Sequence, residues 1–264
     1  MGKQSVVIKC GGSTLAQLPD SFYVDMCELQ LGGIIPIIVH GGGPAINETL
    51  ERLNIESTFI HGLRQTSAEV LQVVEMVLGG QINKAIVRRI LSFGATAVGL
   101  SGIDGRLIQA KPVANTDEVG FVGEVIGVNA ELIQGIVDMG YIPVIAPLGI
   151  GVDGQSFNIN ADTAAGAIAS HLGAERLVVV TDVPGIMKVI DGERIVLPTV
   201  TVADIEQMIA SGDIYGGMIP KVRAAIDCIQ GDVQEVIIVD GSVPEVLSKV
   251  LAGTPGLGTR IVRV

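Results

Sequence analysis

The stretch of sequence that decides the fold reads IIPIIVHGGGP and covers residues 34–44. Its first six residues form an apolar, β-branched run with the length of a buried strand. Three consecutive glycines follow, so bare backbone amides reach the end of that strand without a side chain to cover them. Open α/β sheets bind ligands at the carboxyl ends of their strands. The stretch therefore predicts an anion or oxyanion site at this edge, where we expect glycines to supply left-handed torsions as well as exposed amides.

The same rhythm continues along the rest of the chain. Short β-branched runs alternate with amphipathic segments, and residues 106–128 alternate in the manner of antiparallel hairpins. This βαβ order with one hairpin insertion predicts an α/β fold, a three-layer αβα sandwich around an open, mainly parallel sheet. We expect a lobe boundary near Gly173, where a second αβ series begins. The expected strands are 6–8, 34–39, 95–100, 142–146, 177–180 and 236–239, and the expected helices are 21–32, 45–53, one with Ser67 as its N-cap, 129–140, 160–172 and two that begin near residues 201 and 218.

The composition indicates a protein with a large aliphatic core. Of its 264 residues, 48% are hydrophobic and only 3% are aromatic, so aliphatic side chains must fill one large domain or two intimate lobes. A net charge of −11 without a Lys- or Arg-rich block argues against nucleic-acid and anionic-membrane surfaces. Three cysteines without metal-ligand spacing indicate reduced thiols in the cytoplasm. We expect neither a signal peptide nor an apolar segment that approaches the ~20 residues of a membrane span.

Two lysines are candidates for contact with an anion. Lys9 ends the first expected strand and is followed by Gly11-Gly12, which aims a cation at the sheet edge beside exposed amides. The alternative is a surface lysine whose stem covers apolar atoms. Lys221 falls in the first turn of a helix that follows Gly216-Gly217. Because a cation is unfavourable at the positive end of a helix unless it meets an anion, this position favours a functional role.

Two further segments carry polar side chains of interest. Arg64, in the segment HGLRQT, is a planar fork suited to a carboxylate, and its alternative role is a surface salt bridge. The segment NINAD contains Asn158, Asn160 and Asp162 between a strand and an Ala-rich helix. The two asparagines point the same way on an extended segment. Asn160 or Asp162 is also suited to cap the helix that follows.

Three familiar motifs are excluded. Residues 149–154 match G-x-G-x-x-G, but a short strand rather than a helix follows them, so we expect a hairpin turn. Residues 40–43 look like an esterase oxyanion loop, yet no serine lies in a G-x-S-x-G elbow. No G-x-x-x-x-G-K-[ST] occurs, so a P-loop does not bind ATP in this chain. We expect His40 to be structural, as a neutral imidazole that ties the glycine turn to a neighbouring backbone.

The motifs resemble the amino acid kinase family when they are taken together and in order. The resemblance covers essentially the whole chain, from Lys9-Cys10-Gly11-Gly12 to Gly258-Thr259. Its most specific part is Gly62-Leu63-Arg64 behind the HGGGP turn, combined with residues 158–162. These segments are similar to those of members that act on N-acetyl-L-glutamate. Aspartate, carbamate and uridylate kinases share the glycine turns but differ in the segments that bind the acceptor.

The resemblance implies a fold and a reaction. The fold is a three-layer αβα sandwich whose N-terminal lobe, about residues 1–173, binds the acyl amino acid and dimerises, while the C-terminal lobe, about residues 174–264, binds ATP. The reaction transfers the γ-phosphoryl group of ATP to the side-chain carboxylate of N-acetyl-L-glutamate, the second step of arginine biosynthesis, in the cytoplasm. Mg²⁺ enters with ATP and bridges its phosphates with few direct protein ligands, so we expect no separate metal site.

The resemblance also implies roles for individual residues. Lys9 and Lys221, from the two lobes, flank and neutralise the transferred phosphoryl group, and Asp162 orients both lysines. A carboxylate is already a nucleophile, so catalysis reduces to alignment and charge neutralisation without a general base. The substrate-binding residues are Gly42, Gly43, Arg64, Asn158 and Asn160. The phosphate- and ATP-binding residues are Gly11, Gly12, Thr181, Asp182, Val183, Gly185, Ile186, Met187, Asp213, Ile214, Tyr215 and Gly217.

The chain departs from the family pattern at Cys10 and Gln65, neither of which has to supply chemistry. Arginine-inhibited members carry an extra N-terminal helix that links dimers into hexamers, and only eight residues precede Lys9. We therefore expect a homodimer without that mode of inhibition. The alternatives are a sibling carboxylate kinase with an aminoadipate-type acceptor and a non-catalytic nucleotide sensor on the same fold. The two lysines argue against a sensor, which needs no charge clamp at the γ-phosphoryl group.

Overall fold

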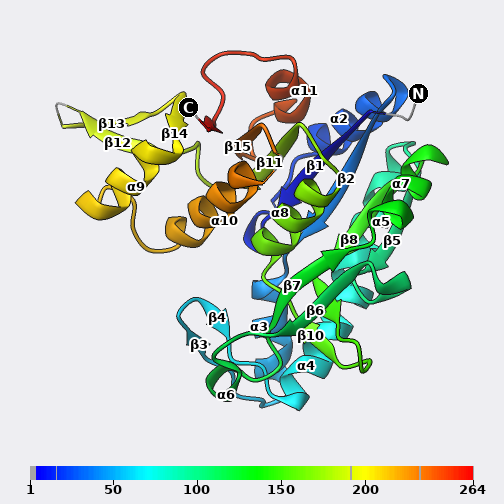
Figure 1. The fold of residues 1–264 in the computed structure, drawn as a ribbon. Helices are drawn as coiled ribbons and strands as arrows, with labels where there is room; N and C mark the ends of the chain where they lie inside the picture. Colours follow the sequence, from blue (N-terminus) through cyan, green and yellow to red (C-terminus); the bar gives the residue numbers. More distant parts are fainter. Residues whose placement is uncertain (1–3, 16, 191, 232, 264) are drawn as a thin grey trace.

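A mainly parallel sheet of eight strands forms the centre of the molecule (Figure 1). The computed structural model describes residues 4–15, 17–190, 192–231 and 233–263. Within them the strand order is β14-β16-β15-β11-β1-β2-β8-β5, and the pair β15–β16 is antiparallel while the other pairs are parallel. The α/β prediction is confirmed. The strands are β1 (Gln4–Cys10), β2 (Ile34–His40), β5 (Ala97–Ser101), β8 (Ile142–Ala146), β11 (Arg176–Thr181), β14 (Thr199–Thr201), β15 (Glu235–Asp240) and β16 (Thr259–Val262).

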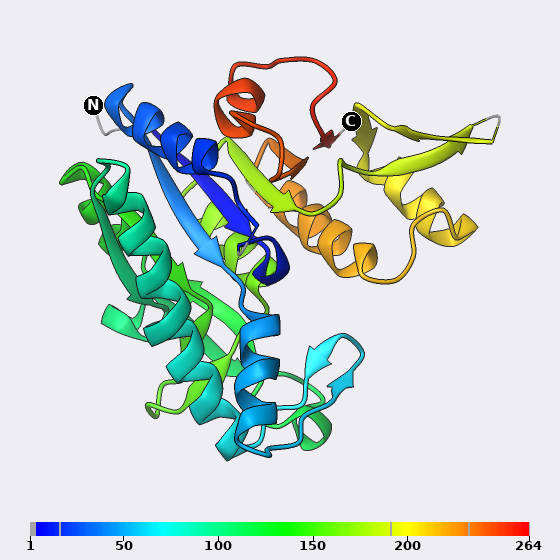
Figure 2. The same cartoon turned by 180° about the vertical axis from the view of Figure 1, so that it is seen from behind.

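Helices cover both faces of this sheet, which explains why its central strands are mainly apolar. Ile8, Ile38 and Val178 are fully buried, as expected for parallel strands with a helical layer on each side. Figures 1 and 2 show the two layers from opposite sides. One layer contains α2 (Asp20–Leu31), α5 (Asn83–Ser92) and α11 (Val246–Leu251), and the other contains α7 (Ala130–Asp138), α8 (Ala161–His171) and α10 (Met218–Gln230). The predicted three-layer sandwich is confirmed.

A second, smaller sheet with the order β10-β9-β6-β7 lies beside the main one. Its pair β6 (Ile108–Pro112) and β7 (Gly123–Val128) is antiparallel, which confirms the predicted hairpin insertion, although a short helix α6 (Thr116–Val119) lies within the connection. The strands β9 (Leu148–Ile150) and β10 (Ser156–Asn158) form an antiparallel hairpin. The G-x-G-x-x-G match therefore spans a hairpin turn, as predicted.

Two small hairpins were not predicted from the sequence. The pair β3 (Phe59–Ile60) and β4 (Leu63–Arg64) lies near the carboxyl end of β2, and the pair β12 (Met187–Ile190) and β13 (Glu193–Val196) follows β11. Each brings side chains to a cavity described below. The remaining helices are α1 (Gly12–Leu15), α3 (Gly43–Arg52), α4 (Ala68–Glu75) and α9 (Val202–Ser211), with a 3-10 turn at Asp104–Arg106.

Helix starts agree with the side-chain signals in the sequence. Ser67 caps α4 by accepting from the Val70 amide, and Asn129 caps α7 by accepting from the Leu132 amide. Thr201 caps α9, where Asp204 completes a capping box. These side chains satisfy amides that have no partner within the helix. The three predicted helix starts are thus confirmed.

One continuous helical segment, Ala68–Ser92, consists of α4, a π-helix at Met76–Ile82 and α5. It is 25 residues long, and its most apolar window of 18 residues has a mean hydropathy of 1.3. The expectation that no segment approaches the length of a membrane span was therefore wrong. Val74, Leu78 and Ile90 of this helix are buried in the protein core. These buried apolar residues of the helix thus serve the interior packing of the fold.

Candidate functional site

The carboxyl ends of four neighbouring strands, β2, β1, β11 and β15, meet at one edge of the sheet. Cys10 is in register with His40 on one side and with Val180 on the other, and Thr181 is in register with Asp240. From β1 the chain builds β2, β5 and β8 on one side and later adds β11, β15 and β16 on the other. Such a reversal of strand order leaves a crevice at the carboxyl ends. Two cavities in the described part of the chain lie along this edge.

Two glycine turns contact each other backbone to backbone at the ends of β1 and β2. A Cβ atom on Gly12 would lie 2.6 Å from the Gly42 nitrogen and 2.8 Å from the Gly43 nitrogen. Only a residue without a side chain allows this approach. The left-handed torsions expected at these turns are not observed, because Gly11, Gly12 and residues 41–43 all have negative φ. The glycines are needed for close contact between the turns.

The smaller cavity, of about 200 Å³, adjoins these turns. It brings together eight of the residues predicted from the sequence, which come from four separate segments of the chain. The unpredicted lining residues are mainly apolar and include Ile46, Leu78 and Ile159. The predicted residues in the lining are Lys9, Gly12, Gly42, Gly43, Arg64, Asn158, Asn160 and Asp162. Gly11 lines neither cavity, and Gly12, predicted as a phosphate contact, lies in this smaller one.

Lys9 is a buried cation at the floor of the cavity. Its Nζ lies 2.8 Å from Asp162 Oδ1, and the two side chains are 6% and 14% exposed. The alternative of a surface lysine is excluded by this burial. The charges of Lys9 and Asp162 have little contact with water, so each is stabilised mainly by the opposite charge of the other. The pair therefore fixes the Lys9 ammonium group beside the glycine amides.

Arg64 presents a guanidinium group to the same cavity. Its Nη2 donates to Asn47 Oδ1 at 2.6 Å, and the group lies 4.7 Å from the centre of the Phe59 ring. Burial lowers the pKa of Arg64 from its ordinary value. No carboxylate of the described chain forms an ion pair with it, so the surface salt bridge considered from the sequence is not observed. An arginine of this kind is suited to bind a carboxylate from outside the chain.

Asn158 and Asn160 differ in what their side chains do. Asn158 donates from Nδ2 to Thr66 Oγ1 at 3.1 Å. Asn160 is the N-cap of α8, because its Oδ1 accepts from the Asp162 and Thr163 amides at 2.9 and 3.2 Å. The Asn160 oxygen is thus engaged in capping, the alternative that the sequence had left open, although the residue still lines the cavity.

His40 stands behind the glycine turn and is fully buried. Its Nδ1 is 3.0 Å from the Gly41 carbonyl oxygen, and its Nε2 is 3.3 Å from Asn83 Nδ2. Burial lowers its pKa to about 4, so the imidazole is neutral at neutral pH. Asn83 also donates to the carbonyls of Leu100 and Val144. The structural role predicted for His40 agrees with these contacts.

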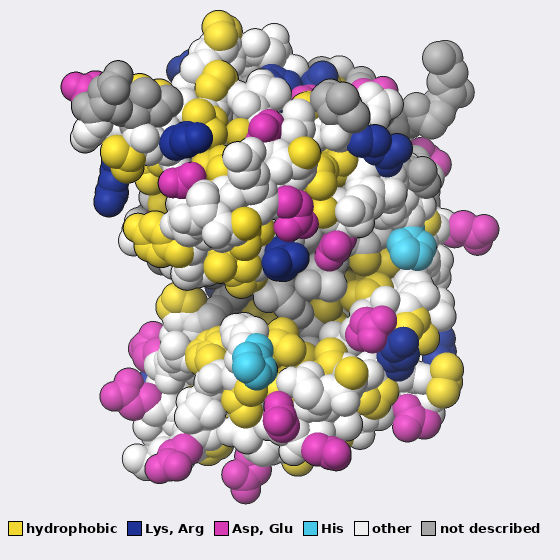
Figure 3. Space-filling view, turned by 60° about the vertical axis from the view of Figure 1, so that its left-hand side comes forward, with side chains coloured by type: hydrophobic (Ala, Val, Ile, Leu, Met, Phe, Trp, Pro, Cys, Tyr) yellow, Lys and Arg dark blue, Asp and Glu magenta, His cyan; other side chains and the backbone are white. Residues whose placement is uncertain are grey.

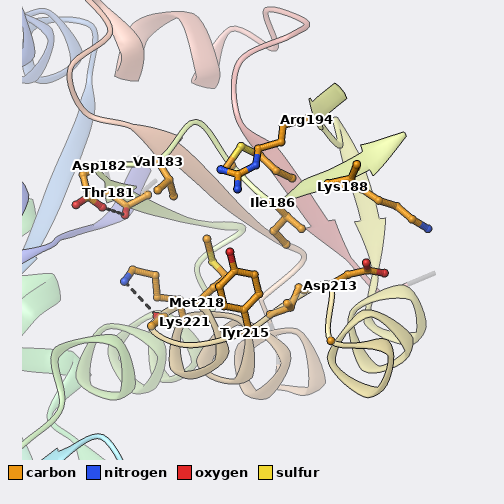
Figure 4. Close-up of a pocket in the computed structure, with 16 residues that line it drawn as sticks. Thr181, Asp182, Val183, Ile186, Lys188, Arg194, Asp213, Tyr215, Met218 and Lys221 are labelled. Atoms are coloured by element: carbon orange, nitrogen blue, oxygen red, sulfur yellow. Dashed lines mark hydrogen bonds between the residues drawn. The ribbon is translucent and has the colours of Figure 1, made fainter. Parts of the chain in front are cut away.

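The larger cavity, of about 490 Å³, lies between β11, the β12–β13 hairpin and the start of α10 (Figure 4). Apolar side chains such as Ile186, which is 1% exposed, lie in its interior, whereas Tyr215 at its margin is 70% exposed. Its volume suits a ligand considerably larger than the smaller cavity holds. All the predicted residues between 181 and 221 line it, together with Lys188, Val189, Arg194, Gly212 and Met218, which were not predicted.

Lys221 belongs to this larger cavity, and this placement corrects one expectation. Its Nζ is 3.4 Å from the Gly217 carbonyl oxygen, and it extends toward the side where Thr181 and Asp182 lie (Figure 4). Asp162, expected to orient both lysines, contacts Lys9 alone within the described residues. The two cavities share no lining residue. The structure therefore holds the two lysines at separate sites along one edge.

Irregular elements supply several cavity-lining residues that were not predicted from the sequence. The β12–β13 hairpin supplies Lys188 and Arg194 to the larger cavity. In the π-helix, Leu78 lines the smaller cavity, and the ends of the Leu78 and Ile82 side chains fill the place that a side chain on Gly42 would occupy. The paired glycines at residues 79–80 were the available signal for this irregular turn. Figure 3 shows a hollow that crosses one face of the molecule, with hydrophobic side chains on both of its rims.

Comparisons with known proteins agree over nearly the full chain. A family model described as "Amino acid kinase family" matches residues 4–240. A curated protein named "Acetylglutamate kinase" from Halalkalibacterium halodurans is 50% identical over 239 residues, which are 90% of this chain and 89% of the relative. Another protein of that name, from Geobacillus sp. (strain WCH70), is 47% identical over 254 residues, 96% of each chain. The solved structure of smu.665 from Streptococcus mutans UA159 has a TM-score of 0.86 at 30% identity and covers 98% of this chain and 99% of its own.

Proposed function

This chain belongs to the amino acid kinase family, and we propose that it transfers the γ-phosphoryl group of ATP to the side-chain carboxylate of N-acetyl-L-glutamate. The product is N-acetyl-L-glutamate 5-phosphate, and the reaction is the second step of arginine biosynthesis. The observation that carries the proposal is the pair of cavities along one sheet edge, one small and polar and the other larger and apolar. Two ligands of different size and chemistry fit that arrangement.

The smaller cavity is the acceptor site in this proposal. Arg64, which has no carboxylate partner among the described residues, binds a carboxylate of the acceptor, and Asn158 binds its polar groups. The amides of Gly12, Gly42 and Gly43 donate to the carboxylate that is phosphorylated and to the phosphoryl group as it transfers. Asn160 shapes the site mainly through its cap on α8.

The larger cavity is the ATP site. The buried side chain of Ile186 and the neighbouring Met187 offer an apolar surface to the adenine ring, and Asp182, Asp213 and Tyr215 offer polar groups at its margin. This division supports a lobe boundary near Gly173, since the acceptor cavity is lined by residues up to 162 and the ATP cavity by residues from 181 onward.

Catalysis in this scheme needs no general base. The acceptor carboxylate attacks the γ-phosphorus, the bond to the ADP oxygen breaks, and negative charge accumulates on the transferred group and on the leaving oxygen. Lys9 neutralises charge from the acceptor side, where Asp162 fixes it, and Lys221 neutralises charge from the ATP side. Because the two lysines occupy separate cavities here, we propose that the two sites approach each other when both substrates are bound.

Mg²⁺ enters as part of the MgATP complex. Among the residues that the structure describes, no group of three or more His, Cys, Asp or Glu side chains is arranged to hold a metal ion. The phosphate oxygens of ATP are hard ligands of the kind that Mg²⁺ prefers. We further propose that the enzyme works as a homodimer in the cytoplasm, as the family resemblance implied.

A hydroxamate-trapping assay tests the proposed reaction, because hydroxylamine captures acyl phosphates. We expect a signal with ATP and N-acetyl-L-glutamate that exceeds the signals with glutamate, aspartate and aminoadipate. A matched reaction without ATP is the control. No signal with N-acetyl-L-glutamate would contradict the proposal, and a stronger signal with aminoadipate would assign the chain to a sibling carboxylate kinase.

A further inference from the structure

Thr66 connects two residues of the proposed acceptor site from behind the cavity wall. It is fully buried and lines neither cavity. Its Oγ1 donates to the Arg64 carbonyl oxygen at 2.7 Å and accepts from Asn158 Nδ2 at 3.1 Å. Since a hydroxyl group has one proton and the carbonyl can only accept, the directions of both hydrogen bonds are fixed.

The backbone holds the Thr66 hydroxyl in this place. The Thr66 amide donates to the Val119 carbonyl oxygen at 2.8 Å, and the Phe121 amide donates to the Thr66 carbonyl oxygen at 2.8 Å. The backbone amide of Asn158 donates to the Phe121 carbonyl oxygen at 2.9 Å. The intervening residue Gly120 has a φ of +70°, and a Cβ there would collide with the Thr66 carbonyl oxygen. Three segments that are distant in sequence are thus joined into one ladder.

These contacts determine which atoms Asn158 offers to a ligand. One Nδ2 proton of Asn158 is used by Thr66, and its other Nδ2 proton and its Oδ1, which have no partner among the described residues, remain for a ligand in the cavity. A carboxamide without such an anchor turns by 180° at little cost, which exchanges donor and acceptor. A fixed amide presents one donor and one acceptor in a constant arrangement, as a specific polar site requires.

We propose that Thr66 is a positioning residue for acceptor binding, which acts by fixing the Asn158 side-chain amide, while the bond to the Arg64 carbonyl oxygen orients the Thr66 hydroxyl. The inference rests on the proposed function, because it takes the smaller cavity as the site of N-acetyl-L-glutamate. Thr66 contributes nothing to the larger cavity. Its loss therefore affects the acceptor and leaves nucleotide binding unchanged.

The test measures kcat and both KM values for Thr66→Val, Thr66→Ala and Thr66→Ser in the full-length enzyme. Thr66→Val keeps the shape of the side chain and removes its hydroxyl group. We expect this variant to raise the KM for N-acetyl-L-glutamate about 10-fold or more, because the Asn158 amide loses its hydrogen-bond partner. The KM for ATP stays within about twofold. Thr66→Ser should keep most of the affinity for N-acetyl-L-glutamate, because serine keeps the hydroxyl group and loses only the methyl group.

A double-variant cycle separates positioning from a general structural role. If Thr66 acts through Asn158, Thr66→Val has little further effect on the acceptor KM in an Asn158→Ala background. An equal rise in both backgrounds would overturn the inference, as would an acceptor KM within twofold of the unmodified enzyme. If Thr66→Val does not fold, the Ala and Ser variants decide, since a serine variant as impaired as the alanine variant would assign the role to the methyl group.

Thr259 provides the matched control. It is also fully buried, and its Oγ1 donates to the Leu197 carbonyl at 2.7 Å and accepts from the Ile186 amide at 2.8 Å, beside the larger cavity. We expect Thr259→Val to raise the KM for ATP while the acceptor KM stays unchanged. An unmodified enzyme without activity on N-acetyl-L-glutamate would refute the proposed function itself, whereas normal activity with a silent Thr66→Val refutes only this inference.

Discussion

The two cavities along the sheet edge are built in opposite ways. The smaller one is assembled from segments that are distant in sequence, and its polar residues Lys9 and Arg64 are buried and held by specific partners. The larger one is lined by residues that all fall between 181 and 221, and its charged side chains Asp182, Lys188 and Arg194 are exposed. A site with few free rotamers discriminates among ligands by geometry, whereas an apolar slot with an open margin gains affinity mainly from buried area. We therefore expect strict acceptor specificity and a more tolerant nucleotide site.

Loss of either Lys9 or Lys221 should have the largest effect on catalysis. The difference between the two cavities predicts that only one of the two losses also affects stability. Both Lys9→Ala and Lys221→Ala should lower kcat by about 10²–10³-fold, because each removes charge neutralisation from the transition state. Only Lys9→Ala should also lower the melting temperature, because it leaves Asp162 without its partner in a nearly buried position. Steady-state kinetics and thermal melts check this pattern. Unchanged turnover in both variants would contradict the mechanism.

Arg64→Lys should break the acceptor site without disturbing the nucleotide site. Lysine keeps the charge but not the planar fork, so we expect the KM for N-acetyl-L-glutamate to rise by about 10–100-fold while the KM for ATP stays unchanged. Arg194→Lys, on the rim of the other cavity, serves as the matched control and should leave the acceptor KM unaltered. A rise in the ATP KM of Arg64→Lys would show that the two sites are not separately built.

The free energy of unfolding should depend on pH because of His40, which lies behind the glycine turn of the smaller cavity. Its pKa of about 4 lies below the ordinary 6.5, so between these values the unfolded chain binds more protons than the folded one. Stability is therefore full above pH 6.5 and falls as the pH drops toward 4, by about 1–3 kcal/mol from this group. Urea unfolding of the unmodified protein and His40→Asn measures the difference, and His171→Asn, at an exposed site, is the control. Equal pH slopes in all three proteins would refute the assignment.

The open margin of the larger cavity should tolerate substitution. Tyr215 is 70% exposed, so Tyr215→Ala should raise the KM for ATP by only about two- to fivefold, with no change at the acceptor site. Nucleotide titrations with ATP and GTP check this. A loss of 50-fold or more would show that Tyr215 closes over the bound nucleotide and would contradict an open margin.

The parts of the fold that could be predicted are those with local signals. Apolar runs such as residues 34–39 identify buried strands because both faces must be covered, and Ser67, Asn129 and Thr201 mark helix starts because a side chain must satisfy free amides. Strands of two to four residues, such as β3 and β14, were missed because so short a run carries no periodicity.

For the candidate site, the sequence identified residue types but not their partners. Lys9 and Asp162 are 153 positions apart, and their pairing follows only from the fold. The glycines were expected to allow unusual torsions, whereas the structure uses them for contact between Gly12 and the second turn. Thr66 was visible only as the residue before a helix cap, because its role depends on two hydrogen bonds that form across the tertiary structure.

The π-helix at Met76–Ile82 makes this region sensitive to the number of residues and not only to their kind. A π-turn incorporates one residue more than the α-helical ladder around it, so the residues after it are out of phase with those before it. Deletion of one residue there would restore a regular helix and rotate everything downstream by about 100°. Asn83 would then turn away from His40 and from the carbonyls of Leu100 and Val144. A one-residue deletion in this turn should therefore be more damaging than most substitutions within it.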